Sequence, residues 1–290
     1  MKILNFRVGQ TKTFGLLRDD GVVDLGLRLS GRFRDVRDII TPEGLEFAKL
    51  YVGVQPDYDV ATIEYLPVID KPERIFGVGM NYIEKRIEFS ETNPAPTLFI
   101  RLPHSQTGHN CPIRKPLETA EFDYEGELAV VIGEPAYRIS SREAYSKVAG
   151  YSCYMDGSVR DWQHSWFTAG KNWPQTGGFG PWLVTRDEIE DPHDLSLTTW
   201  LNGKVVQNES TGKMIHKISD IIAYISTFSP LAPGDVILTG SPGGVGKKRV
   251  PPVYLRDGDV VEVEIESVGR LRNIVKEEGG GIDGSARRRV

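Results

Sequence analysis

Short apolar runs separated by turns make up most of the chain. Residues 2–8 and 13–25 are two such runs, and an Asp-Asp-Gly turn interrupts the second as in a β-hairpin. They predict a small N-terminal β unit. A polar, irregular stretch follows, and the proline-bearing segment 64–74 is typical of a linker. We therefore expect a small β unit with its linker over residues 1–70 and a larger unit over residues 71–278.

The larger unit is predicted to be mainly β. Two helices interrupt it: one covers residues 142–147, behind Ser140 and Ser141 as potential N-caps. In the longer one, four isoleucines between residues 218 and 225 recur at the spacing of one helix face. Because strands do not alternate regularly with long helices, a doubly wound sheet is disfavoured and a β-rich α+β fold is expected. The predicted strands are the runs at 75–79, 97–101, 127–132, 180–184, 197–201, 236–239 and 259–265.

Composition and charge are those of an ordinary soluble globular protein. Of the 290 residues, 39% are hydrophobic and 26% charged, and no apolar run approaches the roughly 20 residues that span a bilayer. No secretory signal is visible, so the cytoplasm is the expected compartment and no membrane partner is expected. The net charge of −5 gives no general attraction to nucleic acid. Two cysteines without CxxC spacing argue against a thiolate zinc site, and residues 279–290 are typical of a disordered tail.

Two carboxylates lie at the start of an unusually apolar strand, in EFDYEGELAVVIG. Glu125 and Glu127 point to the same face because side chains alternate along a strand. Residues 128–132 are apolar on both faces, so this strand is expected to be covered on both sides. By contrast, the glutamates of VVEVEIE, residues 260–266, alternate with apolar residues and predict a solvated acidic face.

Two unpaired negative charges at the rim of a core would be strongly destabilising. Either a divalent cation with oxygen ligands or Arg and Lys partners neutralise Glu125 and Glu127, or their pKa values rise. A third acid, Asp156, ends another apolar run in VAGYSCYMDGSVRDWQ, with Arg160 and Gln163 close behind. On its local sequence alone, Asp156 is equally well a turn residue beside an exposed arginine.

Several segments in succession resemble the blocks of the fumarylacetoacetate hydrolase superfamily. They are DYEGELAVVIG, VAGYSCYMDGSVRDWQ, GKNWPQTGGFGPWLVT and the segment from LNGKVVQNES to SPGGVG, within residues 72–275. The resemblance implies a mixed β-sandwich roll, a homodimer, and one Mg²⁺ or Mn²⁺ per subunit held by Glu125, Glu127 and Asp156. Members act on 2-oxo and β-diketo acids, so the expected partner is a small anionic acid of this class.

The resemblance also implies roles for residues around the ion. Lys171, in GKNW, would hold a ligand carboxylate and the developing negative oxygen of the substrate. Backbone N–H groups of the glycine-rich loop at Gly240 and Ser241 could receive a substrate carboxylate. The other predicted substrate contacts are Tyr82, Arg101, Gln106, Arg160 and Gln163.

The segment GVGMNYIEKRIEF matches the family's lid motif in Asn81, Tyr82 and Glu88 but departs from it at Lys85. Hydrolytic members typically carry a histidine there, which pairs with the glutamate to activate water. Histidine shuttles protons near neutral pH, whereas lysine is a poor base unless it is desolvated. Lys85 is then an anion-binding residue, a desolvated base or a surface residue. The base could be Glu88 alone or a histidine, for which His109 is the favoured candidate.

The resemblance implies, as the leading interpretation, a metal-dependent hydrolase that cleaves a C–C bond of a small diketo acid, such as an acylpyruvate or a fumarylacetoacetate-like intermediate of aromatic or sugar-acid breakdown. The same site could serve an isomerase, hydratase or decarboxylase of a 2-oxo acid, and the lysine at position 85 makes this a serious alternative. A third possibility is a metal-bound binding protein that has lost its base, although Glu88 and Lys171 argue against it.

Overall fold

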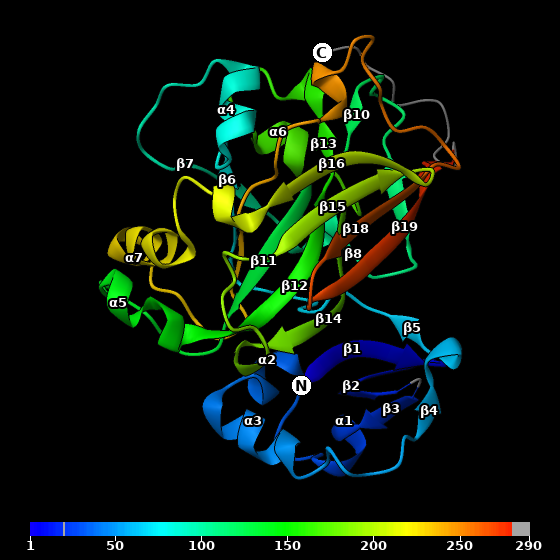
Figure 1. The fold of residues 1–290 in the computed structure, drawn as a ribbon. Helices are drawn as coiled ribbons and strands as arrows, with labels where there is room; N and C mark the ends of the chain where they lie inside the picture. The colour runs from blue at the N-terminus through cyan, green and yellow to red at the C-terminus, as the bar shows by residue number, and fades with distance from the viewer. Residues whose placement is uncertain (20, 280–290) are drawn as a thin grey trace, which may run out of the picture.

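Two mixed β-sheets packed against each other form the centre of the molecule (Figure 1). The computed structural model describes residues 1–19 and 21–279, so the predicted disordered tail lies outside the described residues except for Gly279. Both sheets contain parallel as well as antiparallel pairs. The prediction of a β-rich α+β fold is confirmed.

The larger sheet has 12 strands in the described part of the chain and includes the N-terminal strands. Lys2 pairs with Val184, so the first strand continues the sheet of the larger unit. In order across the sheet lie β4 (Tyr58–Asp59), β3 (Gly21–Asp24), β2 (Thr11–Arg18), β1 (Lys2–Val8), β14 (Gly177–Thr185), β12 (Val148–Asp156), β11 (Gly126–Ile132), β17 (Val236–Leu238), β6 (Ile75–Gly79) and β7 (Thr97–Arg101), with β5 (Glu64–Tyr65) on β1 and β8 (Gln106–Thr107) on β14.

The smaller sheet covers one face of β11, β12 and β14. Its strands, in order, are β16 (Lys204–Ser210), β15 (Ser196–Leu201), β18 (Val260–Ile265), β19 (Gly269–Glu277) and β9 (Pro112–Lys115); β10 (Phe122–Asp123) and β13 (Ser158–Val159) pair separately. Val261, Val263 and Ile265 of β18 are buried while its glutamates are partly exposed, as the alternating pattern predicts.

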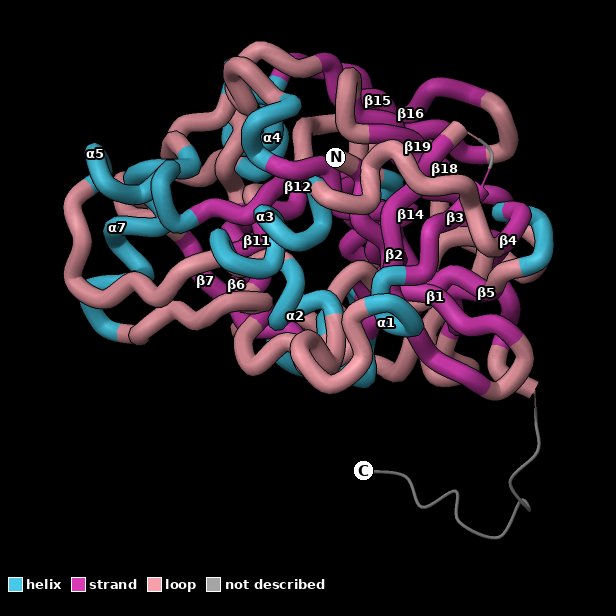
Figure 2. Tube along the Cα trace, turned by 90° about the horizontal axis from the view of Figure 1, so that it is seen from below, coloured by secondary structure: helices cyan, strands magenta, loops and turns pink. Residues whose placement is uncertain are grey.

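The helices lie around the sheets. α7 (Ile218–Phe228) buries its four isoleucines, as predicted, and packs beside α5 (Ser141–Ala144), where Ser140 and Glu143 form a capping box. Figure 2 shows this pair at the side of the molecule away from β2 to β4. The remaining α-helices are α1 (Leu25–Arg28), α2 (Val36–Ile39), α3 (Pro42–Lys49), α4 (Ile83–Phe89) and α6 (Thr168–Lys171). No helix within residues 1–19 and 21–279 is long and apolar enough to cross a membrane.

The N-terminal stretch is more ordered than its polar sequence indicates. Asp35 caps α2, and Thr41 caps α3 ahead of Pro42, in a region that we expected to be irregular. Residues 66–69 of the predicted linker are buried, and β5 pairs with β1. The division of the chain at residue 70 stays a prediction.

Every residue of β11 is buried, as expected for a strand covered on both sides. Leu128, Val130 and Ile132 belong to the core beneath the smaller sheet. Ala129 and Val131 belong to a second core, on the side of the N-terminal helices. The carboxylates at the start of this strand therefore lie at the edge of two apolar cores.

Candidate metal centre

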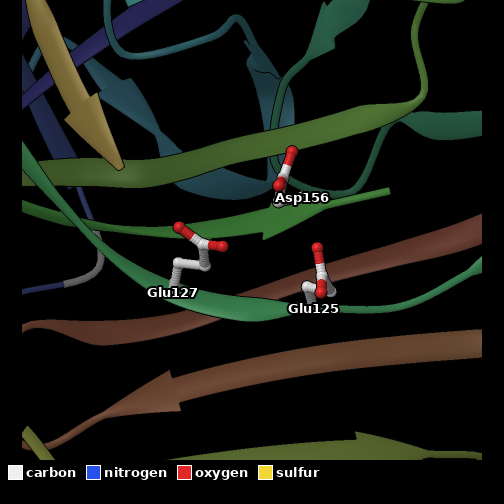
Figure 3. A group of neighbouring side chains, drawn as sticks. All are labelled: Glu125, Glu127 and Asp156. Carbon is white, nitrogen blue, oxygen red and sulfur yellow. The ribbon is translucent and has the colours of Figure 1, made fainter. Parts of the chain in front are cut away.

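Strand pairing brings Glu125, Glu127 and Asp156 together (Figure 3). Gly126 pairs with Met155 in the antiparallel β11–β12 ladder, and the Asp156 N–H donates to the Glu125 carbonyl at 2.8 Å. Asp156 therefore lies opposite Glu125, and all three carboxylates gather at this end of the two strands. Each has a carboxylate oxygen within 4.8 Å of the others, and all three side chains are buried.

Glycine between the two glutamates allows the sheets to approach here. A Cβ on Gly126 would lie 2.1 Å from Thr199 Oγ1 of β15, closer than any side-chain contact permits. The Gly126 N–H donates to Gln207 Oε1 at 2.9 Å. The sequence Glu-Gly-Glu thus supplies two carboxylates on one face and close sheet packing on the other.

Three basic side chains surround Glu125. Lys171 donates to Glu125 Oε2 at 2.5 Å and also contacts Asp156. Arg160 donates to Glu125 Oε1 at 3.0 Å, and Lys85 contacts the same oxygen. The structure therefore brings both lysines and Arg160 to the acidic cluster, as the predicted roles require.

Arg101 also lies at the cluster, where it fixes Asp156. Its guanidinium contacts Asp156 Oδ1 and donates to the Gly157 carbonyl, to the Ser105 carbonyl and hydroxyl, and to the Thr176 hydroxyl. These acceptors account for all five N–H groups of an arginine. Arg101 is therefore a positioning residue for Asp156, and no N–H remains for the substrate carboxylate that we expected it to bind.

The glycine-rich loop completes the wall of the site. The Gly240 N–H donates to Glu127 Oε2 at 2.9 Å, and Ser241 Oγ accepts from Lys85 at 2.5 Å. Gly240 and Ser241 thus contact the cluster itself. In this structure the two residues hold Glu127 and Lys85 in place. Their role in receiving a substrate carboxylate stays a prediction.

Asp123 and Asn81 support the site and were not predicted to do so. Asp123 accepts from Arg160 at 2.8 Å and from the N–H groups of Gly246 and Lys247. It precedes Glu125 by two residues, a spacing that could have revealed it. Asn81 donates to the Thr239 carbonyl at 2.8 Å and so fixes the glycine-rich loop beside β6.

Burial and charge act differently on the two glutamates. Burial opposes ionisation of Glu125, but Arg160, Lys171 and Lys85 outweigh it and hold the Glu125 pKa well below its ordinary value. Burial, together with the charges of Asp156 and Glu125, raises the pKa of Glu127 to about 8. Within the described residues, no basic side chain pairs with Glu127 and its only hydrogen bond is from Gly240. Glu127 is therefore the carboxylate that a further cation would stabilise most.

The three carboxylates fit a divalent ion. Mg²⁺ binds oxygen ligands at about 2.1 Å, which places two ligand oxygens of one ion up to about 4.2 Å apart. The observed separation of at most 4.8 Å closes to that range with small side-chain movements. An all-carboxylate set suits hard ions such as Mg²⁺ and Mn²⁺. The buried triad thus supports a divalent metal site, with Glu125, Glu127 and Asp156 as its ligands.

Three of the predicted site residues, Tyr82, Glu88 and Gln163, carry polar atoms that have no partner among the described residues. Tyr82 precedes α4 and is fully buried, yet its hydroxyl has no hydrogen-bond partner among the described residues. Within the same residues, Glu88 Oε2 also has none, although its other oxygen accepts from the Gly244 N–H at 2.9 Å. Gln163 accepts from Arg160, but its Nε2 is unpaired there. Tyr82, Glu88 and Gln163 each retain a group that could contact a substrate.

Within the described residues, neither His109 nor Gln106 is hydrogen-bonded to the three carboxylates. The His109 ring packs against Tyr65, and its Nδ1 accepts from the Arg272 N–H at 3.1 Å. Burial and the charge of Arg272 lower the His109 pKa to about 4. Gln106 donates to the Ile69 carbonyl at 3.3 Å. These contacts give the His109 ring a structural role, so its predicted role in catalysis gains no support. Gln106 Oε1 is buried without a partner among the described residues, so its predicted role in substrate binding stays a prediction.

Glu125 and Glu127 border a small cavity. Its volume is about 20 Å³, and its lining includes Lys85, Glu125, Glu127, Arg160 and Lys171. Such a space holds a water-sized species, since a cavity of about 10–15 Å³ is enough for one water molecule. A four-carbon acid therefore enters only if the surrounding lid moves.

Comparison with known proteins agrees with this geometry. Residues 74–276 match the family model described as fumarylacetoacetate (FAA) hydrolase C-terminal. The mitochondrial oxaloacetate tautomerase of Xenopus laevis is 42% identical over 221 residues, covering 74% of this chain and 69% of the relative. A fumarylacetoacetate hydrolase domain-containing protein 2 homolog of Dictyostelium discoideum is 34% identical over 285 residues, covering 92% and 93%. The fumarylacetoacetate hydrolase of psychrophilic Exiguobacterium antarcticum has 32% identity and a TM-score of 0.81, covering 96% of this chain and 100% of that one. The chain therefore belongs to the fumarylacetoacetate hydrolase family of enzymes.

Proposed function

We propose that this enzyme interconverts the keto and enol tautomers of a small 2-oxo dicarboxylic acid of the oxaloacetate type, with Mg²⁺ or Mn²⁺ as its cofactor. The proposal replaces the C–C bond hydrolase that we favoured from the sequence with the isomerase that we considered as its alternative. A relative that is 42% identical carries the name oxaloacetate tautomerase. The predicted homodimer and cytoplasmic location remain predictions.

The observation that carries the proposal is the lysine at position 85. Its ammonium lies at the carboxylates, in contact with Glu125 and 2.5 Å from Ser241 Oγ. No hydrogen bond within the described residues joins any of the five histidines to Lys85 or to the three carboxylates. The histidine–glutamate pair that would activate water for hydrolysis is therefore missing from this lid.

Tautomerisation needs groups that move one proton and hold negative charge on oxygen, and it consumes no water. A divalent ion, when bound, would polarise the keto oxygen as a Lewis acid. Lys171 and Lys85 place two ammonium groups at the cavity, where they would stabilise charge on the substrate oxygens.

Glu88 is our candidate for the group that accepts the carbon-bound proton. Gly244 holds one of its oxygens, and the other, Oε2, is buried without a hydrogen-bond partner in the part of the chain that the structure describes. Glu88→Gln keeps the shape and removes the basicity, so kcat should fall by about 10²- to 10⁴-fold while Mn²⁺ still binds. A variant with unchanged kcat would remove Glu88 from this role.

The proposed reaction is tested by following the ultraviolet absorbance of enol oxaloacetate with purified protein and Mg²⁺ or Mn²⁺. The wild type should accelerate loss of the enol, chelation should abolish the effect, and Glu127→Gln should be inactive. Glu264→Gln, on the partly exposed face of β18, is the matched control and should retain activity. Acylpyruvates should yield no fragments. Cleavage of an acylpyruvate into two acids, without any effect on the enol, would instead support the hydrolase.

A further inference from the structure

We propose that Lys85 makes the enzyme selective for dicarboxylates over monocarboxylates, because it supplies the positive charge that pairs with the second carboxylate of the substrate. The inference rests on the proposed function and names the residue that sets its substrate class. It follows from the balance of charges in the site and from the contacts of each basic side chain.

The site contains equal numbers of acidic and basic side chains in one buried cluster. None of the eight is more than 6% exposed, and ion pairs link all of them except Glu127, whose carboxylate lies beside the other two ligands. The members are Asp123, Glu125, Glu127 and Asp156 with Lys85, Arg101, Arg160 and Lys171. When all are ionised, their charges cancel.

A bound divalent ion changes this balance by two positive charges, since metal binding requires ionised carboxylates. A monocarboxylate would leave one of these charges without compensation in a buried site, and such charges are costly. A dicarboxylate compensates both. With a neutral residue at position 85, the same loaded site would match a monocarboxylate instead.

Three of the four basic residues are committed to the protein. Arg101 has all five N–H groups occupied, and Arg160 lies between Asp123 and Glu125. Lys171 bridges two predicted metal ligands, Glu125 and Asp156, so it stays beside them while its third N–H can donate to a substrate oxygen. The charges of these three residues neutralise the carboxylates beside them.

Lys85 is the basic residue whose ammonium group can leave its protein partner and pair with a ligand. Its carboxylate partner, Glu125, also receives Arg160, Lys171 and the Ser158 hydroxyl, so it stays hydrogen-bonded without Lys85. An ammonium has three N–H donors, and Lys85 uses two, toward Glu125 and Ser241. One donor therefore remains for a substrate even before Lys85 leaves Glu125.

The position of Lys85 on α4 links this contact to substrate entry. The cavity of about 20 Å³ is too small for a four-carbon acid, so α4 or the loop before α6 moves outward when the substrate enters. Lys85 moves with α4 and can close onto the distal carboxylate. Among the described residues, neither acidic residue of this helix pairs with Lys85: Glu84 lies against Gly243, and Glu88, the proposed base, accepts from Gly244 and is not a member of the cluster whose charges balance.

The test compares L-malate with L-lactate, which are both 2-hydroxy acids and differ by one carboxylate. Their dissociation constants are measured by calorimetry on the Mn²⁺-loaded protein. The Kd of Mn²⁺ is measured in the presence of each acid from the electron paramagnetic resonance signal of free Mn²⁺. Wild type, Lys85→Gln, Lys85→Arg and the exposed control Lys204→Gln are compared.

We expect the wild type to bind malate about 10- to 100-fold more tightly than lactate, the range of one charge-assisted hydrogen bond. By linkage, malate should also tighten Mn²⁺ binding more than lactate does. Lys85→Gln should lose most of this selectivity with little change for lactate, whereas Lys85→Arg and Lys204→Gln should keep it.

Equal affinity of the wild type for the two acids would overturn the proposal without requiring any variant to fold. An equal loss of affinity for malate and for lactate in Lys85→Gln would also overturn the proposal, because Lys85 would then contact the part that the two ligands share. These readouts are binding equilibria. A protein that prefers malate through Lys85 but does not interconvert oxaloacetate tautomers would support this inference and contradict the proposed reaction.

Discussion

The histidine that we favoured as a base gives a prediction that separates a structural from a catalytic role. His109 accepts a hydrogen bond from the Arg272 N–H through Nδ1, so that nitrogen must stay unprotonated. Its pKa is lowered from 6.5 to about 4, first by burial and then by the charge of Arg272. The perturbation is His109→Asn, whose side-chain oxygen can accept the same hydrogen bond but does not titrate.

The sign and size of the effect follow from the two pKa values. The unfolded chain binds a proton on His109 below about pH 6.5, whereas the folded protein resists it until about pH 4. The contribution of the neutral ring is therefore present above pH 6.5 and is lost as the pH falls toward 4. At about 1.36 kcal/mol per pKa unit, it amounts to about 3 kcal/mol in full, of which about 2 kcal/mol is lost at pH 5.

The assay is urea unfolding of wild type and His109→Asn at pH 7.5 and pH 5. The difference between their free energies of unfolding should shift by about 2 kcal/mol in favour of the variant at pH 5. His104→Asn, at an exposed histidine, controls for the substitution itself. Activity should change less than about threefold, whereas loss of a general base costs about 10²- to 10⁴-fold. A pH-independent difference together with a collapse of kcat would refute the structural role.

Two further substitutions test the supports of the carboxylates. Arg101→Met removes the buried partner of Asp156 and should lower the free energy of unfolding by about 3–5 kcal/mol, measured with urea in the absence of metal; a loss below about 1 kcal/mol would show that Asp156 is held by other groups. Gly240→Ala places a Cβ 2.7 Å from the Val78 carbonyl at a φ of +95°. It should cost about 1–3 kcal/mol and weaken Mn²⁺ binding by moving the N–H away from Glu127; undiminished Mn²⁺ affinity would contradict that link.

The sequence predicted the part of the site that strand periodicity controls. Glu125 and Glu127 share a face because side chains alternate, and apolar residues on both faces of 128–132 correctly indicated a doubly covered strand. That Asp156 lies opposite Glu125 depends on the register of β12 against β11. No local pattern specifies this register, so the meeting of the three carboxylates was available only through the family resemblance.

Other features depend on contacts between distant segments and were therefore missed. The pairing of β1 with β14 joins residues about 180 positions apart. The local sequence of neither strand specifies which strand it pairs with. Arg101, at the end of a predicted strand, was expected to contact the substrate, but the chain folds its guanidinium onto Asp156. Asp35 and Thr41, the N-caps of α2 and α3, are residue types that indicate helix starts. We missed these two helices because the stretch is polar and was interpreted as irregular.

Titration of the apoprotein with Mn²⁺, monitored by the resonance of the free ion, addresses the central claim most directly. The wild type should bind one ion per chain, and Glu127→Gln should bind it more weakly by over about 100-fold, more than loss of an outer partner of a ligand costs. Glu264→Gln should match the wild type. Saturable binding of unchanged affinity in Glu127→Gln would mean that the ion binds elsewhere. The cluster of Glu125, Glu127 and Asp156 would then not be the metal site.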